Sequence, residues 1–255
     1  RFDLVDYDKA SVETQLDSAS TAPLPAYLQV TIDSKRDYRE LSPLLGAVFT
    51  PGEHLSLYAN TGRAFAPPSP LVVGDQQPEK SVQYEIGAKT DLLNGRLNAN
   101  FALFNIDKEN IAIPDDNGLT RQIGDQRSRG LELELIARPT PSWYAQASYA
   151  YLDAELTRFN EFAQLPVPGF FDRSGNAPAF APEHLLTLWA ARDFGAHLTL
   201  AGGARYVGSQ YAAEDNVYQI DGAPTFDLGL TYRQGPGLLR INLKNVTNRE
   251  YETRG

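Results

Sequence analysis

The chain has 255 residues, a formal net charge of −9 and a hydrophobic content of 42 %. These values exclude a helical membrane protein, because no stretch approaches the roughly 18 apolar residues that a spanning helix needs. The acidic balance, without any basic stripe, argues against nucleic acid as a partner, and the lack of cysteine excludes disulfides and thiolate metal sites. A transmembrane β-barrel stays possible, because half of each barrel strand is polar.

The first predicted strand covers residues 1–8, where Arg1 opens the strand-like segment RFDLVDYD. The chain contains no methionine. We therefore expect the sequence to begin within a longer protein, and the lack of a signal peptide carries no information about export.

Connections of two kinds separate the strand-like segments along the whole chain. Short ones, rich in Pro, Gly and Asn, fall at 50–53, 91–95, 139–142, 194–197 and 234–237, and longer ones fall at 9–40, 64–80, 114–121, 157–182 and 212–223. The two kinds alternate, as they do in an outer-membrane barrel with short periplasmic turns and long extracellular loops. We therefore expect all the short turns to lie at one rim, opposite the loop 157–182.

The sequence thus predicts an all-β, antiparallel up-and-down transmembrane β-barrel. The eleven predicted strands cover residues 1–8, 41–50, 54–63, 81–91, 96–113, 120–138, 143–156, 183–193, 198–211, 224–233 and 238–249. In the hairpin of residues 81–113 the apolar side chains alternate with polar ones, and Asn94-Gly95 supplies the positive φ of a tight turn. Strands 96–113 and 120–138 are longer than a bilayer requires, so their hairpin around Asp115–Gly118 should project beyond it.

Alternation also assigns each strand an outer and an inner face, although strand 183–193 does not alternate cleanly. Charged residues in the polar phase are expected to face the barrel lumen, and to pair across neighbouring strands or to reach a plug domain. They are Glu85, Lys89, Arg96, Glu132, Glu134, Arg205, Asp227, Arg240 and Lys244.

Aromatic residues in the apolar phase are expected to form two girdles at the membrane interfaces. Phe49, Trp143 and Tyr232 lie near the short turns, and Tyr84, Tyr149, Tyr151, Tyr206 and Phe226 lie near the opposite ends. The alternative is that these rings form the core of a soluble β-sandwich.

Little in the sequence suggests reaction chemistry. His54, His184 and His197 lie at or beside strand ends without ligand spacing, so they are expected to be exposed rather than to bind zinc. Glu132 and Glu134 share a face and could resemble an acid–base pair, but the pattern places them in a polar lumen. No nucleophile motif is present. We expect no enzyme, no metal site and no cofactor.

The long connections are richer in binding chemistry. Aromatic and Arg side chains at loop bases can contact a flat, metal-chelating ligand by stacking and by charge. The candidate ligand-binding residues are Arg63, Phe65, Phe170, Phe171, Tyr211 and Tyr218. The alternative for each is that it packs loops against one another.

Several segments resemble the barrel of TonB-dependent outer-membrane siderophore receptors. They are LSLYANTGRAFAPPSP (55–70), YEIGAKTDLLNGRLNANFALFNIDKENI (84–111), GDQRSRGLELEL (124–135), ASYAYLDAEL (147–156), GGARYVGSQY (202–211) and INLKNVTNREYETRG (241–255). The subgroup that they most suggest is the ferrichrome/hydroxamate type.

The resemblance implies a 22-stranded barrel, a plug domain and energy from the inner-membrane TonB–ExbB–ExbD complex. Residues 1–255 would then be about eleven strands of the C-terminal half of the barrel, without the plug and without the last strand. The implied function is active uptake of ferric siderophores across the outer membrane by a monomer embedded in lipid, with iron present only as a siderophore-bound ligand. The alternative from another class is a passive porin.

Overall fold

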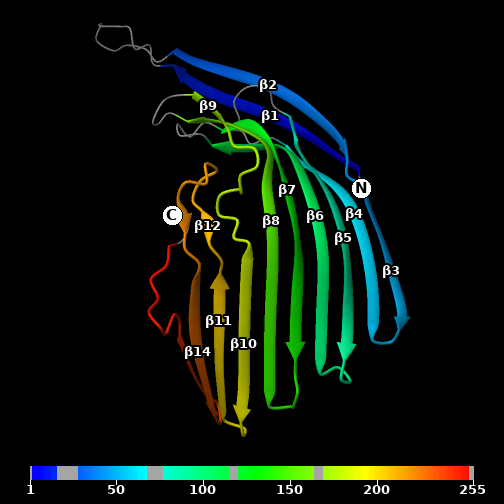
Figure 1. Cartoon of the computed structure of the whole chain (residues 1–255), viewed down its shortest axis with the longest axis vertical. Helices are drawn as coiled ribbons and strands as arrows, with labels where there is room; N and C mark the ends of the chain where they lie inside the picture. Colours follow the sequence, from blue (N-terminus) through cyan, green and yellow to red (C-terminus); the bar gives the residue numbers. More distant parts are fainter. Residues whose placement is uncertain (1, 16–27, 68–76, 115–119, 164–168, 253–255) are drawn as a thin grey trace.

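The computed structural model describes residues 2–15, 28–67, 77–114, 120–163 and 169–252, with side chains for 40–67, 77–112, 124–161 and 169–252. Most strands form one curved antiparallel sheet whose order is β15-β14-β11-β10-β8-β7-β6-β5-β4-β3, with β9 added beside β8. Each long strand therefore pairs with its neighbours along the chain, as in the wall of an up-and-down barrel (Figure 1). No helix of the described part is long and apolar enough to cross a membrane.

The wall is built of long strands. They are β3 (Leu44–Gly52), β4 (Leu55–Ala66), β5 (Glu79–Leu92), β6 (Leu97–Pro114), β7 (Thr120–Ala137), β8 (Trp143–Ala163), β10 (His184–Phe194), β11 (Leu198–Val207), β14 (Ala223–Gln234) and β15 (Gly237–Leu243). Short elements accompany them: β9 (Gly169–Asp172) on β8, and the pair β12 (Gln210–Tyr211) and β13 (Gln219–Ile220).

All five short connections lie at one rim of the sheet, the lower one in Figure 1. Residues with positive φ make these turns tight: Asn94 (57°) and Gly95 (81°) between β5 and β6, Gly195 (64°) between β10 and β11, and Gly235 (55°) between β14 and β15. The described parts of the long connections lie at the opposite rim. The predicted alternation of rims is confirmed.

The beginning of the chain differs from the prediction. β1 (Phe2–Gln15) and β2 (Leu28–Leu41) pair with each other along their whole length, from Phe2 opposite Leu41 to Gln15 opposite Leu28, in a sheet of their own. The predicted strand 1–8 was therefore too short, and the predicted connection 9–40 was wrong for residues 28–40. The apolar alternation of Leu28, Val30 and Ile32 is short, and the charged run 33–40 that follows it hid the rest of this strand.

Two other predicted strand ends were also wrong. β8 continues to Ala163, well beyond the predicted end at residue 156, and pairs with β9 there. The predicted strand 198–211 breaks after Val207, where the N–H of Gly208 donates to the carbonyl of His184. The predicted connections 64–80, 114–121 and 157–182 lie partly outside the described residues, and so does the hairpin tip around Asp115–Gly118.

β15 ends at Leu243, six residues before the predicted boundary. Asn245 adopts a positive φ of 47°, its side chain bonds to Arg249 in both directions, and its N–H donates to Asp227 at 2.8 Å. These bonds replace the sheet ladder and turn the chain away from the strand.

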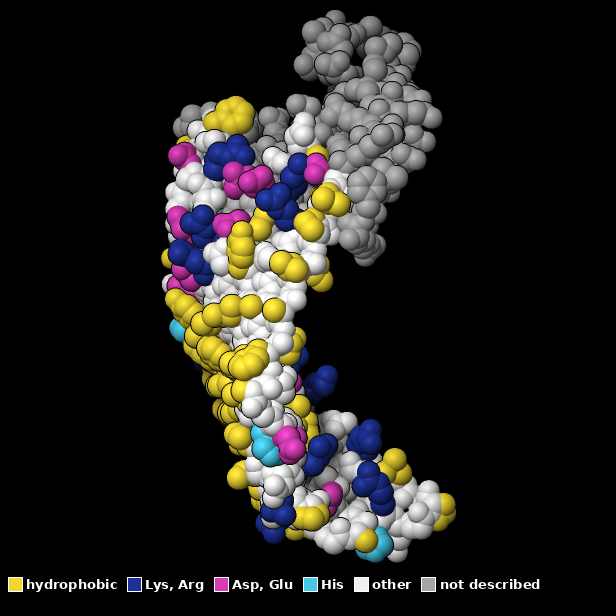
Figure 2. Space-filling model, turned by 90° about the vertical axis from the view of Figure 1, so that its right-hand side faces the viewer, with side chains coloured by type: hydrophobic (Ala, Val, Ile, Leu, Met, Phe, Trp, Pro, Cys, Tyr) yellow, Lys and Arg dark blue, Asp and Glu magenta, His cyan; other side chains and the backbone are white. Residues whose placement is uncertain are grey.

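The strand register fixes which side chains share a face. One outer row runs across the sheet through Leu57, Ala88, Phe101, Leu133 and Tyr149. Hydrophobic side chains gather in a band over the middle of one side of the molecule, with charged side chains above them (Figure 2).

The sequence did not show which side chains of β10 face outward, and the pairing of β10 with β8 assigns its two faces. Leu186 and Leu188 lie opposite Tyr149 and Ala147 on the outer face, whereas Trp189 lies opposite Gln146 on the inner face.

Aromatic rings on the inner face repeatedly cover a glycine of the next strand. Tyr58 lies opposite Gly87, Phe104 opposite Gly130 and Trp189 opposite Gly203. A Cβ added at Gly130 would lie 2.7 Å from Phe104 Cζ, and one at Gly203 would lie 3.0 Å from Trp189 Cζ3. The rings therefore lie flat against the wall because the opposing residue has no side chain.

Burial is concentrated where β6, β7 and β8 extend beyond the other strands. Leu156 and Phe159 are fully buried there and form a small core with Ile111. Residues 173–176 close the free edge of β8, since Gly175 donates to the carbonyl of Leu156 at 2.8 Å. Elsewhere the described wall is a single layer whose two faces are open.

Candidate functional site

Most of the charged side chains that the sequence assigned to the lumen share one face of the wall, and their exposure to a lumen stays a prediction. Seven of the nine, namely Glu85, Lys89, Glu132, Glu134, Arg205, Asp227 and Arg240, lie in wall strands on the face opposite the apolar row. Arg96 lies in the turn before β6, and Lys244 follows the last residue of β15. One row across five strand pairs runs from Lys89 through Asn100, Glu134, Ser148 and Thr187 to Arg205.

Neutral side chains, rather than opposite charges, contact the charges on this face. Asn100 donates to Glu134 at 3.2 Å and Gln83 donates to Glu85 at 3.1 Å. No ion pair joins two of the nine predicted residues within the described part of the chain. The register explains this, because Asn100 separates Lys89 from Glu134 and two strand spacings amount to about 10 Å. The other expectation, contact with a plug domain, stays a prediction.

Two hollows lie on the inner face and share Arg205. One of them, about 390 Å³, is lined on this face by Glu132, Glu134, Ser148, Thr187 and Arg205. The other, about 310 Å³, lies nearer the long-loop rim, where Arg205 is joined by Phe180, Gln210, Asp221, Tyr251 and Glu252. Two aromatic residues, a guanidinium and carboxylates thus converge on a space of the size that small ligands occupy.

The long connections beside this second hollow bond to one another. The Asn216 side chain donates to the carbonyl of Ala177 and accepts from its N–H, both at 2.8 Å. The N–H of Phe180 donates to the carbonyl of Tyr211 at 2.9 Å. Residues 176–180 and 211–216 therefore form one joined loop cluster.

The end of the described chain joins this cluster through Tyr218. Its hydroxyl donates to the carboxylate of Glu252 at 3.0 Å, and this hydrogen bond raises the pKa of Tyr218. Residues far apart in sequence, 176–182, 211–221 and 251–252, thereby close one side of the hollow.

The six predicted ligand-binding residues fall into three separate places. Arg63 and Phe65 lie in β4 opposite Val82 and Lys80, in the phase of the outer apolar face. Phe170 and Phe171 lie in β9 at the far end of β8, where the guanidinium of Arg173 lies 5.2 Å from the ring of Phe171.

Only the other two of the six lie beside the second hollow. Tyr211 is in β12, and Tyr218 precedes β13. Ligand contact by any of the six stays a prediction.

The aromatic residues predicted for the girdles all lie in the outer phase of their strands. Phe49, Trp143 and Tyr232 are near the short turns, and Tyr84, Tyr149, Tyr151, Tyr206 and Phe226 are farther from that rim. His184 joins the second group, because its Nδ1 lies 3.0 Å from the hydroxyl of Tyr149 and its ring lies 5.4 Å from that of Tyr151.

Beyond the second group of aromatics, the outer face becomes charged. Arg127 donates to Asp107 at 2.7 Å, and Arg129 lies 3.5 Å from Asp153. The hydrogen bond from Arg127 lowers the pKa of Asp107, despite partial burial of the carboxyl. The outer surface thus changes from apolar to ionic along the same strands, which is consistent with their predicted extension beyond a bilayer.

Sequence reasoning missed Asp221, Tyr251 and Glu252 as lining residues. No local signal could have found them, since residues 251–252 reach the hollow only because Asn245 turns the chain out of β15. No three His, Cys, Asp or Glu side chains of the described residues lie close enough together to hold a metal ion.

The sheet order, the short-turn rim, the apolar outer face and the charged inner face define part of a transmembrane-type β-barrel wall. In sequence, the family "TonB dependent receptor-like, beta-barrel" matches residues 1–248. The chain belongs to this family.

Curated relatives and solved structures agree with this assignment. The chain is 28 % identical over 231 residues to the metal-pseudopaline receptor CntO of Pseudomonas aeruginosa, covering 87 % of the chain and 31 % of that receptor. It is 31 % identical over 185 residues to the catecholate siderophore receptor Fiu of Escherichia coli K12, covering 69 % of the chain and 23 % of Fiu. Their names describe receptors rather than enzymes.

Among solved structures, the closed form of Fiu from Escherichia coli K12 matches with a TM-score of 0.76 at 24 % identity, covering 97 % of this chain and 37 % of that one. The siderophore receptor PiuA of Acinetobacter baumannii matches with a TM-score of 0.76 at 24 % identity, over 89 % and 34 %. These likenesses show the fold. The chain spans about a third or less of the curated relatives that it matches.

Proposed function

We propose that this chain is part of the barrel of a TonB-dependent receptor that takes up ferric siderophores across the bacterial outer membrane. The observation that carries the proposal is the family match over residues 1–248, joined to a wall that is apolar outside and charged inside. Residues 1–255 would form the C-terminal half of that barrel. Iron would enter only as chelated cargo, and the energy would come from the TonB–ExbB–ExbD complex.

The second hollow would contribute to capture of the ferric complex. Arg205 and the rings of Phe180 and Tyr251 offer charge and stacking to a flat chelate, and the joined loop cluster holds them in place. The passive-porin alternative has less support, because the matching family is defined by dependence on TonB.

For the cargo we propose an uncharged ferric hydroxamate, the subclass that the sequence motifs suggest. Two carboxylates, Asp221 and Glu252, line the hollow with a single guanidinium, Arg205. Such a site disfavours a strongly anionic ferric catecholate and tolerates a neutral complex. Similarity to the catecholate receptor Fiu supports the second candidate, a catecholate cargo.

Uptake of radiolabelled iron tests both points. The complete receptor would be expressed in cells that lack their own siderophore receptors, with and without TonB, and offered a ferric trihydroxamate or a ferric tricatecholate. We expect uptake of the trihydroxamate only where TonB is present, and reduced uptake by Arg205→Gln.

Three outcomes would count against the proposal. Uptake without TonB would support a passive porin. Uptake of the tricatecholate alone would show that the cargo is a catecholate and not a hydroxamate. Normal uptake by the Arg205→Gln variant would show that the second hollow does not contribute to capture.

A further inference from the structure

Arg192 is an exception on the apolar outer face of the wall. In β10 it follows the phase of Leu188 and lies opposite Trp143 on β8 and Leu200 on β11. The adjacent carboxylate, Asp193, belongs to the inner face, where Thr199 donates to it at 2.6 Å. We consider the strand segments that lie between the two groups of girdle aromatics. In these segments no acidic side chain of the described residues lies on the outer face.

Two aromatic rings hold the Arg192 guanidinium in place. Its carbon lies 5.2 Å from the centre of the Trp143 ring and 4.8 Å from that of Phe194. Ring faces attract a cation but do not accept its N–H groups as an oxyanion does. No described residue forms an ion pair with Arg192. The arrangement therefore offers a fixed, unsatisfied fork of donors.

The depth of Arg192 is that of a lipid headgroup. β8 from Trp143 to Tyr151 covers roughly 27 Å at about 3.4 Å per residue, which is roughly 20 Å of depth at a strand tilt of about 40°. Trp143 and Tyr151 thus lie near the two edges of an apolar band, and Arg192, opposite Trp143, lies at the edge beside the short turns.

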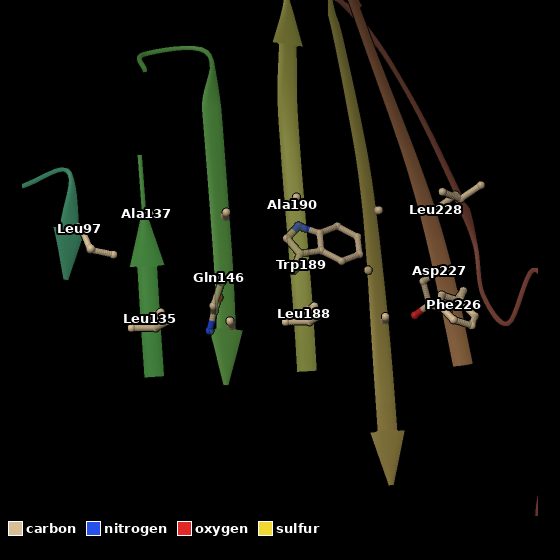
Figure 3. Close-up of a pocket in the computed structure, with 15 residues that line it drawn as sticks. Leu97, Leu135, Ala137, Gln146, Leu188, Trp189, Ala190, Phe226, Asp227 and Leu228 are labelled. Atoms are coloured by element: carbon tan, nitrogen blue, oxygen red, sulfur yellow. The ribbon is translucent and has the colours of Figure 1, made fainter. Parts of the chain in front are cut away.

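An apolar groove of about 620 Å³ lies on the same face of the wall. Its floor is made of small residues: Ala137, Ala145, Ala147, Ala190, Gly202 and Ala204. Leu97 and Leu135 border it on one side, and Phe226 and Leu228 on the other (Figure 3). Ala190 is two residues from Arg192 in the same phase, so the groove leads from the guanidinium toward the middle of the apolar band.

We propose that Arg192, Trp143, Phe194 and this groove bind one glycerophospholipid of the periplasmic leaflet. The phosphate would accept the guanidinium N–H groups, which suit a bidentate oxyanion, and one acyl chain would lie along the groove. This inference rests on the proposed position in the outer membrane. Charge complementarity selects the occupant, because a diacylglycerol could fill the groove but would leave Arg192 without an anion.

Native mass spectrometry of the complete receptor tests the site, with dioleoylphosphatidylglycerol as the probe and dioleoylglycerol as the phosphate-free comparison. We expect one phosphatidylglycerol per receptor and about tenfold weaker binding by Arg192→Gln, the loss typical of one charge-assisted contact, with partial recovery in Arg192→Lys. Arg233→Gln, which removes a charge near the same rim in the inner phase, should bind as the wild type does.

A second pair of variants tests the groove. Ala147→Leu fills its floor without touching Arg192 and should weaken binding, whereas Ala59→Leu, on the outer face of β4 away from the groove, should not. Wild-type binding by Arg192→Gln or by Ala147→Leu would overturn the proposal, and so would equal binding of dioleoylglycerol. If the receptor forms a dimer and Ala147→Leu disrupts that dimer, the occupant of the groove is a second copy of the receptor rather than a lipid.

Flotation of the receptor with vesicles separates this inference from the proposed function. Failure to float would contradict the membrane position itself, whereas loss of the lipid site alone would leave flotation and iron uptake intact.

Discussion

At the scale of single residues, Asn216 has the most consequential contacts in the loop cluster. Its φ of 56° suits Asn or Gly, and its amide bonds to both backbone groups of Ala177. We predict that Asn216→Ala loses both bonds and adds backbone strain, which would destabilise the cluster by about 1–3 kcal/mol. Asn216→Gly should lose the bonds without the strain.

Hydrogen exchange of residues 176–180 and 211–216 in the complete receptor would measure both effects. Faster exchange in Asn216→Ala than in Asn216→Gly is expected, with the strands of the wall unchanged. Unchanged exchange in Asn216→Ala would show that other contacts hold the two loops together.

At the scale of elements, the pairs of an aromatic ring and a glycine decide how the strands lie. A side chain at Gly130 would collide with the carbonyl oxygen of Tyr151 and with Phe104, whereas one at Gly46 would meet no atom closer than 3.7 Å. We predict that Gly130→Val destabilises the folded barrel by about 1–3 kcal/mol, as overpacking does, and that Gly46→Val is close to neutral.

Denaturant titration of the refolded complete receptor in lipid would compare the two variants, with heat-modifiable mobility as a check of folding. Equal midpoints would mean that the ring of Phe104 can leave the wall without loss of stability.

At the scale of the whole molecule, the two rims should lie on opposite sides of the membrane. These 255 residues contain no cysteine, so a single substitution within them can report on position. Val217, which is 82 % exposed near the second hollow, should react as Val217→Cys with an impermeant maleimide on intact cells. Glu53→Cys, in the turn between β3 and β4, should react only after the outer membrane is disrupted.

The unsubstituted receptor supplies the background for this labelling. Reaction of Glu53→Cys on intact cells at the rate of Val217→Cys would contradict the assignment of rims.

Much of the wall could be predicted from sequence, because turn chemistry and alternation are local. Asn94-Gly95 identified a hairpin, and the phase of Tyr84 and Leu133 identified the outer face. What could not be predicted depends on long-range contacts: the end of β15 is set by Asp227 on another strand. The second hollow depends likewise on residues 251–252 lying near Arg205.

The order of the wall strands also has a consequence for assembly. Each wall strand pairs with its neighbours in sequence, so the chain can gain its ladder hydrogen bonds by closing one connection at a time, the short turns first. The entropy lost in closing a loop rises with the logarithm of its length, and local pairings form faster than distant ones. The hairpins β5–β6 and β7–β8 should therefore form early. The union of β8 with β10 must close residues 152–183, because His184 pairs with Tyr151, and should form late.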